Sequence, residues 1–325
     1  MILTYTKIIV YLLEYMCMRL IARVVGWPFT PPQKLSKAQK LTINTAFNGL
    51  LTRWKLVIKQ FPRSNQLSSP IAHLKRYRLI LTDLHNFLER KQKKDSTDLS
   101  GIKFSVDCPE YFKRNYHYQT DGYFSFKSAM RYDHQIELLF LGSGHIMRKV
   151  AYAELANILK GSENVLEFGA GSGTSGHQFK QIFPGTVLDI LEPSTAYLDF
   201  ARRTYPHSFN EIIPAFMEDF KSLKKYDCIF SCFVMHEIPV AFWDLVVQRL
   251  KESLKLNGHL FIIDSQQNCD NPAHQFALDQ FAEDFYEPYF QEYRENSLEE
   301  YFHQQGFKLI KKSEVLFSKT LLFTL

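Results

Sequence analysis

A glycine-rich turn is the clearest candidate for chemistry in this chain. It lies in the run VLEFGAGSGTSGHQF at residues 165–179, between an apolar run typical of a strand and a segment typical of a helix. Glycine permits sharp turns and lets a ligand approach the backbone closely. Glu192 follows at the end of the next apolar run, where its carboxylate could accept hydrogen bonds from ribose hydroxyls. These residues predict a site for a nucleotide-like ligand.

The spacing of the glycines fits two kinds of ligand. Gly171, Gly173 and Gly176 satisfy G-x-G-x-x-G, the fingerprint of dinucleotide binding. Glu167, Gly169, Gly171 and Gly173 satisfy E-x-G-x-G-x-G, which resembles the signature of class I S-adenosylmethionine-dependent methyltransferases. The motif alone therefore leaves a nicotinamide enzyme and a methyltransferase open.

The elements that would position this turn begin at Gly161, where short apolar runs alternate with helical patterns. The predicted strands are 164–169, 186–191, 211–216, 226–233 and 259–264, and the predicted helices between them are 174–183, 194–205 and 239–255. Such alternation indicates parallel strands with crossover helices. The runs FKLIKK and VLFSKTLLFTL are separated only by Ser313-Glu314, so we expect an antiparallel hairpin at the end of the sheet.

Four features favour the methyltransferase resemblance. Glu167 is acidic near the end of the first predicted strand, where dehydrogenases usually have an apolar residue. The segment FMEDF puts Glu218 and Asp219 after the third strand, where that family binds adenine. The run LKLNGHLFIID is similar to the family's L-K-P-G-G turn, although Leu256 and Asn257 depart from it. The terminal hairpin matches the family's antiparallel last strand.

Further segments widen the resemblance. HYQTDGYFSFKSAMRYDHQIELLFLGSG, FVMHEIP, DSQQNCDNP and EPYF are similar to methyltransferase-domain proteins related to the ubiquinone/menaquinone C-methyltransferases. The similarity covers about residues 108–325. It implies an α/β fold with a Rossmann-like sheet and an antiparallel last strand, and it implies S-adenosyl-L-methionine as the cofactor. The methyl acceptor is left open.

The resemblance also implies which residues hold the cofactor. They are Glu167, Gly169, Gly171, Gly173, Glu192, Phe216, Met217, Glu218 and Asp219. The glycines would let the backbone approach the methionine part, and Glu167 would lie near its ammonium group. Glu192 would accept both ribose hydroxyls. Asp219 is expected to bind the adenine amine, with Glu218 as the alternative.

Candidate catalytic residues are His236 and Glu237, which follow the fourth predicted strand. Ligands of open parallel sheets bind beyond the carboxyl ends of the strands, so both residues are expected near the transferred methyl group. His236 could take a proton, since the unperturbed pKa of histidine is about 6.5. Alternatively His236 only shapes the cavity and Glu237 bonds the backbone, because methyl transfer depends most on an aligned nucleophile.

Candidate acceptor-binding residues come from two other segments: His117, Gln119, Asp121, Tyr123, Tyr289 and Tyr293. The first four precede the sheet, where segments of this fold commonly cover the donor site as a lid. The alternatives are turn chemistry around Asp121 and aromatic core packing for Tyr289 and Tyr293. No metal ligands are predicted, because the other histidines, such as His73, are isolated in the sequence.

The chain divides by composition into three predicted parts: a helical N-terminal region (1–100), a lid and helical segment (101–160) and an S-adenosylmethionine-binding domain (161–325). Hydrophobic residues make up 46% of the chain and charged residues 22%, which excludes a wholly disordered protein. Residues 1–120 hold 20 basic and 7 acidic residues, a net charge of +13. The basic residues are dispersed, so we expect a solvated face rather than a nucleic-acid site.

The first predicted helix has apolar residues on one face: Ile2, Tyr5, Ile9, Leu12, Met16, Leu20 and Val24. We expect this face to pack on the rest of the protein; the alternative is contact of residues 1–30 with a membrane surface or a partner. Charged residues interrupt the apolar run, so no transmembrane helix is predicted. The five cysteines show no zinc-site spacing, and reduced thiols predict a cytoplasmic protein, with membrane association as the alternative.

Together these features predict an S-adenosylmethionine-dependent methyltransferase acting on a small, hydrophobic acceptor. The aromatic content of 15% and the apolar, basic N-terminus favour such an acceptor. An RNA or protein methyltransferase is one alternative. A donor-binding scaffold without turnover is another, although the glycines and Glu192 are all present.

Overall fold

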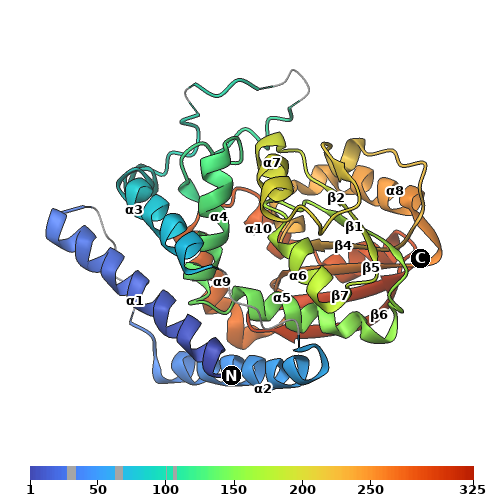
Figure 1. Ribbon diagram of the computed structural model, residues 1–325, viewed down its shortest axis with the longest axis horizontal. Helices are drawn as coiled ribbons and strands as arrows, with labels where there is room; N and C mark the ends of the chain where they lie inside the picture. Colours follow the sequence, from blue (N-terminus) through green and yellow to red (C-terminus); the bar gives the residue numbers. More distant parts are fainter. Residues whose placement is uncertain (28–33, 63–68, 100, 105–107) are drawn as a thin grey trace.

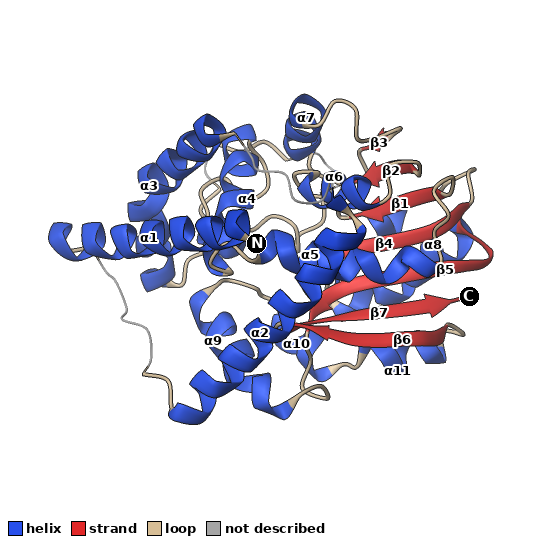
Figure 2. Ribbon diagram, turned by 60° about the horizontal axis from the view of Figure 1, so that its bottom comes forward, coloured by secondary structure: helices blue, strands red, loops and turns tan. Residues whose placement is uncertain are grey.

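One mixed sheet organises the chain. A computed structural model describes residues 1–27, 34–62, 69–99, 101–104 and 108–325. The described residues form a seven-stranded sheet in the order β3-β2-β1-β4-β5-β7-β6, with helices around it (Figure 2). The strands are β1 (Asn164–Phe168), β2 (Val187–Leu191), β3 (Ile212–Ile213), β4 (Tyr226–Cys232), β5 (Leu254–Ser265), β6 (Lys308–Val315) and β7 (Ser318–Thr324). Strands β1 to β5 run parallel, and β7 is antiparallel to β5 and β6, which confirms the predicted fold.

The parallel strands are apolar because both faces of the sheet are covered. The crossover helices are α6 (Thr174–Ile182), α7 (Thr195–Thr204) and α8 (Trp243–Ser253). Val165 and Leu166 are neighbours in β1, yet they belong to two different buried clusters, as the alternation of side chains along a strand requires. The clusters fix the sheet from both sides and hold its carboxyl edge in place.

Several predicted strand boundaries differ from the structure, and β5 begins at Leu254 rather than at residue 259. The predicted strand 211–216 is reduced to the two residues of β3, because Pro214 has no backbone N–H to donate to the sheet. The terminal hairpin turns at Leu316 and Phe317 rather than at Ser313-Glu314, which pair within the hairpin. Leu316 adopts a positive φ of 57°, a turn conformation that the sequence pattern does not reveal.

Helices before the sheet close one side of the molecule (Figure 1). They are α1 (Ile2–Val25), α2 (Lys37–Gln60), α3 (Pro70–Lys93), α4 (Phe126–Leu139) and α5 (Gly144–Tyr152). Helix α4 packs on α3 and α1, and α2 packs on α5. Trp54 of α2 is fully buried in the same cluster as Val165 of β1. Helix α2 therefore shares a buried cluster with the sheet. The division of the chain at residues 100 and 160 stays a proposal.

Helix α1 is oriented opposite to the expectation. Its buried residues are Thr4, Tyr11, Glu14 and Ala22. The predicted apolar face is exposed instead, with Leu20 62% and Ile9 55% accessible. The prediction that this face packs on the protein is wrong. No helix among the described residues is long and apolar enough to cross a membrane.

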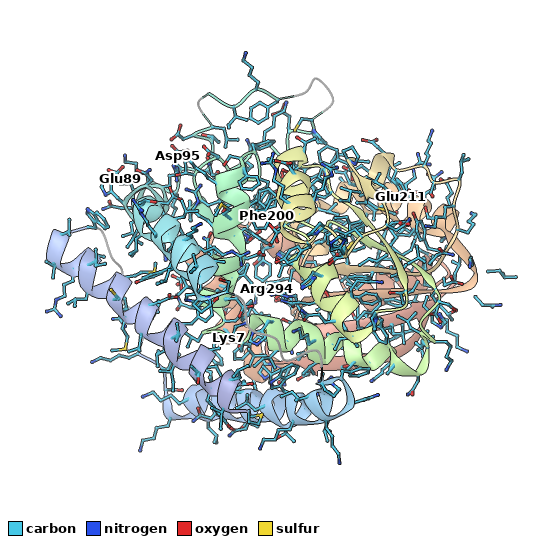
Figure 3. All side chains as sticks on the ribbon, in the orientation of Figure 1. Lys7, Glu89, Asp95, Phe200, Glu211 and Arg294 are labelled. Atoms are coloured by element: carbon cyan, nitrogen blue, oxygen red, sulfur yellow. The ribbon has the colours of Figure 1, made fainter. Side chains whose placement is uncertain are left out.

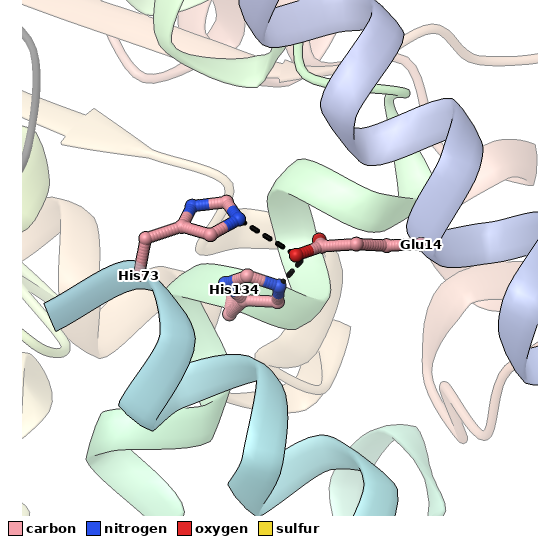
Figure 4. A group of neighbouring side chains, drawn as sticks. All are labelled: Glu14, His73 and His134. Atoms are coloured by element: carbon pink, nitrogen blue, oxygen red, sulfur yellow. Dashed lines mark hydrogen bonds and ion pairs between the residues drawn. The ribbon is translucent and has the colours of Figure 1, made fainter. Parts of the chain in front are cut away.

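A buried polar group holds α1 in this orientation. Glu14 lies between His73 of α3 and His134 of α4, with Oε–Nε2 distances of 2.7 and 2.9 Å (Figure 4). Burial raises the pKa of Glu14, but hydrogen bonds from His134 and His73 outweigh it and hold the pKa below its usual range. Burial lowers the pKa of His134, so its neutral ring donates Nε2–H to the carboxylate. His73, isolated in the sequence, is therefore not isolated in space.

Replacing Glu14 should loosen this helix. Glu14→Ala leaves two imidazole N–H groups without their acceptor, and we expect the free energy of unfolding to fall by about 2–3 kcal/mol. Urea unfolding followed by circular dichroism measures the change. Glu89→Ala is the control, because Glu89 pairs with His85 one turn away on the exposed face of α3. Equal losses in both variants would contradict the role given to Glu14.

Candidate active site

A cavity of about 530 Å³ lies at the carboxyl edge of the parallel strands. That volume is typical of small-ligand sites. The loops after β1, β2 and β4 contribute to its wall, and residues of α1, α2 and α4 contribute as well. Strand ends far apart in the sequence thus meet in one place, as open parallel sheets require.

The glycine turn after β1 forms part of the cavity wall. Gly169, Gly171 and Gly173 have φ angles of 65°, 53° and 75°, which side chains rarely adopt. A Cβ on Gly169 would lie 2.5 Å from Val234, and one on Gly173 would lie 2.7 Å from Ala201. Gly171 differs, because an added Cβ would meet nothing closer than a ring atom 4.0 Å away. Its backbone therefore borders open space.

Glu192 ends β2 and lines the cavity beside this turn. Its carboxylate accepts hydrogen bonds from the backbone N–H groups of Gly171 and Ser194, both at 2.9 Å. Burial raises the pKa of Glu192 to about 7, against these two hydrogen bonds. The side chain is fixed in orientation, and a carboxylate has further lone pairs for the hydroxyls of a ligand.

Glu167 lies behind the turn rather than in the cavity wall. It is fully buried, beside the Ser175 hydroxyl and the backbone of Gly176. Burial raises its pKa to about 8. A Cβ on Gly176 would lie 2.5 Å from Glu167 Oε2, so the glycine gives the carboxyl its space. Glu167 does not line the cavity, so any effect on a ligand would be indirect, through the position of the glycine turn.

The loop after β3 brings an apolar pair and one acidic residue to the cavity. Phe216, Met217 and Glu218 line the wall, and Asp219 does not. Glu218 accepts a hydrogen bond from the hydroxyl of Tyr111, and burial raises its pKa. The two adjacent acidic residues therefore differ in position, because only Glu218 faces the cavity. The sequence alone left the choice between them open.

His236 follows β4 and lines the cavity. Its Nδ1 lies 2.6 Å from Asp264 Oδ1, at the end of β5. Burial lowers the pKa of His236, but the Asp264 carboxylate outweighs it and raises the pKa to about 10. Asp264 also accepts hydrogen bonds from the backbone of Val234 and Met235, so one carboxylate fixes both the turn and the imidazole.

Glu237 lies next to His236 in the cavity wall. Its Oε1 accepts a hydrogen bond of 2.6 Å from the hydroxyl of Tyr123. Burial and the neighbouring Glu287 carboxylate raise the pKa of Glu237 to about 7. A carboxyl group with this pKa can exchange a proton near neutral pH.

His117 completes the polar part of the wall. Its Nδ1 lies 2.9 Å from Glu287, and its Nε2 lies 3.7 Å from Glu237. Burial lowers the pKa of His117, but Glu287 outweighs it and raises the pKa. His117 and the following Tyr118 have positive φ angles of 53° and 54°. Strained backbone of this kind persists where the surrounding structure fixes it, often at functional sites.

The remaining predicted residues lie elsewhere. Gln119 is buried and donates to the Gly122 carbonyl and the Tyr197 hydroxyl, so it fixes the segment from behind. Asp121 has a φ of 70° in a turn. Tyr289 packs edge-on against Tyr111, and Tyr293 is fully buried in the core. The predicted residues that do not line the cavity are Glu167, Gly173, Asp219, Gln119, Asp121, Tyr289 and Tyr293.

The sequence reasoning missed several partners. Tyr111, Glu287 and Asp264 contact Glu218, His117 and His236. Only the place of Asp264 at a strand end could have indicated its role. In the described part of the chain, two groups bring ligand-type atoms of histidine and glutamate within 4.8 Å: Glu14, His73 and His134, and His117, Glu237 and Glu287.

The site fits S-adenosylmethionine in two respects. The backbone at Gly171 faces open space that a side chain would fill, as a close-lying ligand requires. Glu192 presents an oriented carboxylate to the same part of the cavity, where hydroxyls of a ribose could bind. Both features come from the residues that join β1 to α6 and β2 to α7.

Comparison with protein families identifies the chain. Residues 134–312, more than half of the sequence, match the family of methyltransferase domains. The chain belongs to this family. It is a class I S-adenosylmethionine-dependent methyltransferase, and S-adenosylmethionine is its cofactor. No curated protein matches the sequence.

Solved structures of methyltransferases resemble the chain at low identity. The N-methyltransferase NodS from Bradyrhizobium japonicum WM9 is 12% identical, and the match covers 56% of this chain and 98% of that one, with a TM-score of 0.40. Magnesium protoporphyrin IX methyltransferase (ChlM) from Synechocystis PCC 6803 is 12% identical, with coverages of 61% and 83% and a TM-score of 0.40. A putative sarcosine dimethylglycine methyltransferase from Galdieria sulphuraria is 15% identical, with coverages of 57% and 87% and a TM-score of 0.43.

Removing the Glu192 carboxylate should weaken donor binding. We expect Glu192→Ala to raise the Kd for S-adenosylmethionine by about 10- to 100-fold, because charge-assisted hydrogen bonds are worth about 1.5–3 kcal/mol. Calorimetric titration measures the Kd. Asp219→Ala is the matched control, since Asp219 lies outside the cavity wall, and its Kd should stay within about twofold of the wild type. A larger increase in Kd for Asp219→Ala than for Glu192→Ala would show that the donor binds elsewhere.

Proposed function

We propose that the protein transfers the methyl group of S-adenosylmethionine to a small, hydrophobic acceptor that carries an ionisable hydroxyl group. The observation that carries this proposal is the apolar wall of the cavity away from its polar groups. That wall consists of Ile8, Ile43, Phe47, Ile136, Phe140, Phe233, Leu278, Phe281, Leu316 and Phe317. A wall of this composition favours a lipophilic molecule over a charged one.

The donor side of the cavity is assigned from the residues that border it. The backbone at Gly169 and Gly171 would take the methionine part, and Glu192 would accept the ribose hydroxyls. Phe216 and Met217 would lie beside the adenine ring. Glu218 is preferred over Asp219 for the adenine amine, because only Glu218 lines the cavity. When bound, S-adenosylmethionine supplies an electrophilic methyl group on a sulfonium centre.

Glu237 is the proposed general base. Its carboxyl group has a pKa of about 7, and the Tyr123 hydroxyl holds it in the cavity wall. His236 has a pKa of about 10 and keeps its proton at neutral pH, so it is a poor base. Its positive charge would instead stabilise an acceptor oxygen that has lost its proton to Glu237. His117 and Glu287 would position Glu237.

A base in this position supports an oxygen acceptor. A neutral hydroxyl group is a weak nucleophile, and it attacks a methyl carbon much better after losing its proton. An uncharged amine already offers a lone pair and needs no base for the attack. The apolar wall would hold the acceptor in line with the methyl group, and orientation can supply a large part of the acceleration.

Contact with a membrane is the remaining part of this proposal. We propose a cytoplasmic protein that meets its lipophilic acceptor at a membrane surface through residues 1–30, of which residues 28–30 lie outside the described part of the chain. The exposed side of α1 supports this contact. An RNA or protein acceptor, and a scaffold without turnover, are outcomes that the following experiment separates.

Incubation with tritium-labelled S-adenosylmethionine and a total lipid extract should place label in the organic phase. The Phe47→Ala variant should need a higher acceptor concentration for half-maximal labelling, because it shortens the apolar wall, while its Kd for the donor stays unchanged. Exposed Leu256→Ala is the control. Label in RNA or protein would favour the alternative acceptors, and donor binding without any labelled product would favour the scaffold.

Turnover of the acceptor found in this way should depend on the Glu237 carboxylate. We expect kcat/KM to rise with pH and to level off above about 7, because the base must be unprotonated. Glu237→Gln should lower kcat by about 10²- to 10⁴-fold and abolish the rise. Release of S-adenosylhomocysteine reports the rate.

Tyr123→Phe provides the control for this pH dependence. The hydrogen bond from Tyr123 lowers the pKa of Glu237, so its loss should move the rise to higher pH. A pH profile that is unchanged in both variants would exclude Glu237 as the base.

A further inference from the structure

The outward side of α1 carries a continuous row of large apolar residues. They are Ile2, Tyr5, Ile9, Leu12, Leu13, Met16 and Leu20, here named the apolar stripe of α1, and all of them are exposed. Apart from the adjacent pair Leu12 and Leu13, successive residues of the row are three or four positions apart, which places them on one side of the helix. Large apolar patches on a protein surface mark sites of protein or membrane contact.

Specific contacts on the opposite side of α1 keep the apolar stripe outward. The hydroxyl of Thr4 accepts a hydrogen bond of 3.0 Å from the indole of Trp54. Glu14 contacts His73 and His134, as Figure 4 shows. Hydrophobic burial alone would turn the stripe inward, at about 25 cal/mol for each Å². The buried polar groups oppose that rotation, so the stripe is a defined surface.

The charge around the stripe favours an anionic partner. Helix α1 meets α2 near its N-terminus, where Thr4 contacts Trp54 (Figure 1). The two helices contain eight basic residues and one acidic residue, Glu14, which is buried. Two of the basic residues do not add to the outer charge: Lys7 is partly buried (Figure 3), and Arg53 pairs with Glu154. Lys37, Lys40, Lys55 and Lys59 of α2 are exposed. A second copy of this chain would bring a like-charged surface, whereas a bilayer with anionic lipids brings the opposite charge.

The same two helices line the cavity. Ile8 of α1 and Ile43 and Phe47 of α2 are part of its apolar wall. The outer side of α1 is therefore a surface for apolar contact, while its inner side helps to enclose the acceptor space. A lipophilic molecule that left a bilayer beside α1 would therefore be close to the apolar wall of the cavity.

We infer that the apolar stripe of α1 docks the protein on the surface of an anionic lipid bilayer. The stripe enters the boundary between headgroups and acyl chains, and the exposed basic residues of α1 and α2 meet the lipid phosphates. That the docked protein draws its acceptor from the bilayer rests on the proposed function. The docking itself rests on α1 and α2 alone.

Vesicle flotation tests the docking. The full-length protein is floated with phosphatidylcholine vesicles with and without phosphatidylglycerol. We expect recovery with the anionic vesicles, and the Leu13→Glu/Leu20→Glu variant should lose about tenfold or more of it, because two apolar contacts become two anionic groups. The matched control is Leu223→Glu/Leu256→Glu, which changes two exposed leucines away from α1 and should retain binding.

The outcomes separate docking from catalysis. Equal recovery of both double variants, or no recovery of the wild type, would overturn the inference. Light scattering after gel filtration adds a third result: a wild-type dimer that the stripe variant splits, with unchanged flotation, would assign the stripe to a second copy. Titration with S-adenosylmethionine shows that each variant is folded. Docking without methylation of any lipid would overturn the acceptor proposal and leave the docking intact.

Discussion

The hydrogen bond from the Gly171 N–H to the Glu192 carboxylate joins the turn after β1 to the end of β2. β1 lies next to the central strand β4, and β2 lies on the other side of β1, so the contact joins two strands that are both paired on each side. The glycine can take part because its φ of 53° turns the backbone toward the cavity. The contact orients the carboxylate and leaves the backbone at Gly171 open to the cavity, and the proposed donor site is built on both.

A second constraint is the placement of charge in a buried wall. His236 is paired with Asp264, and His117 with Glu287, so each imidazole has its own carboxylate. Glu237 accepts a hydrogen bond from Tyr123, and burial and the neighbouring Glu287 carboxylate raise its pKa to about 7. Similar groups with different partners have different pKa values. One can then stay charged while another exchanges a proton near neutral pH.

The sequence located the glycine turn and Glu192 in the cavity wall, whereas most of the apolar wall could not be predicted, for a physical reason. The glycine turn and Glu192 each follow a strand directly, so local spacing and strand alternation place them. The acceptor wall combines segments from both ends of the chain, such as Ile8, Phe140 and Phe317. No local pattern encodes those contacts. The choice between Glu218 and Asp219 could not be made from spacing either, because a short 3-10 helix determines that Glu218 faces the cavity.

Helix α1 shows what periodicity can and cannot determine. The spacing of its apolar residues predicts the helix and its apolar face, because both follow from 3.6 residues in each turn. Which side packs inward depends on partners elsewhere in the chain. Glu14 is one of few polar residues in α1, and it finds two histidines from α3 and α4. Turning α1 over would leave His73 and His134 without the acceptor that Glu14 provides. Together with the Trp54–Thr4 hydrogen bond, these contacts determine which side of α1 faces inward.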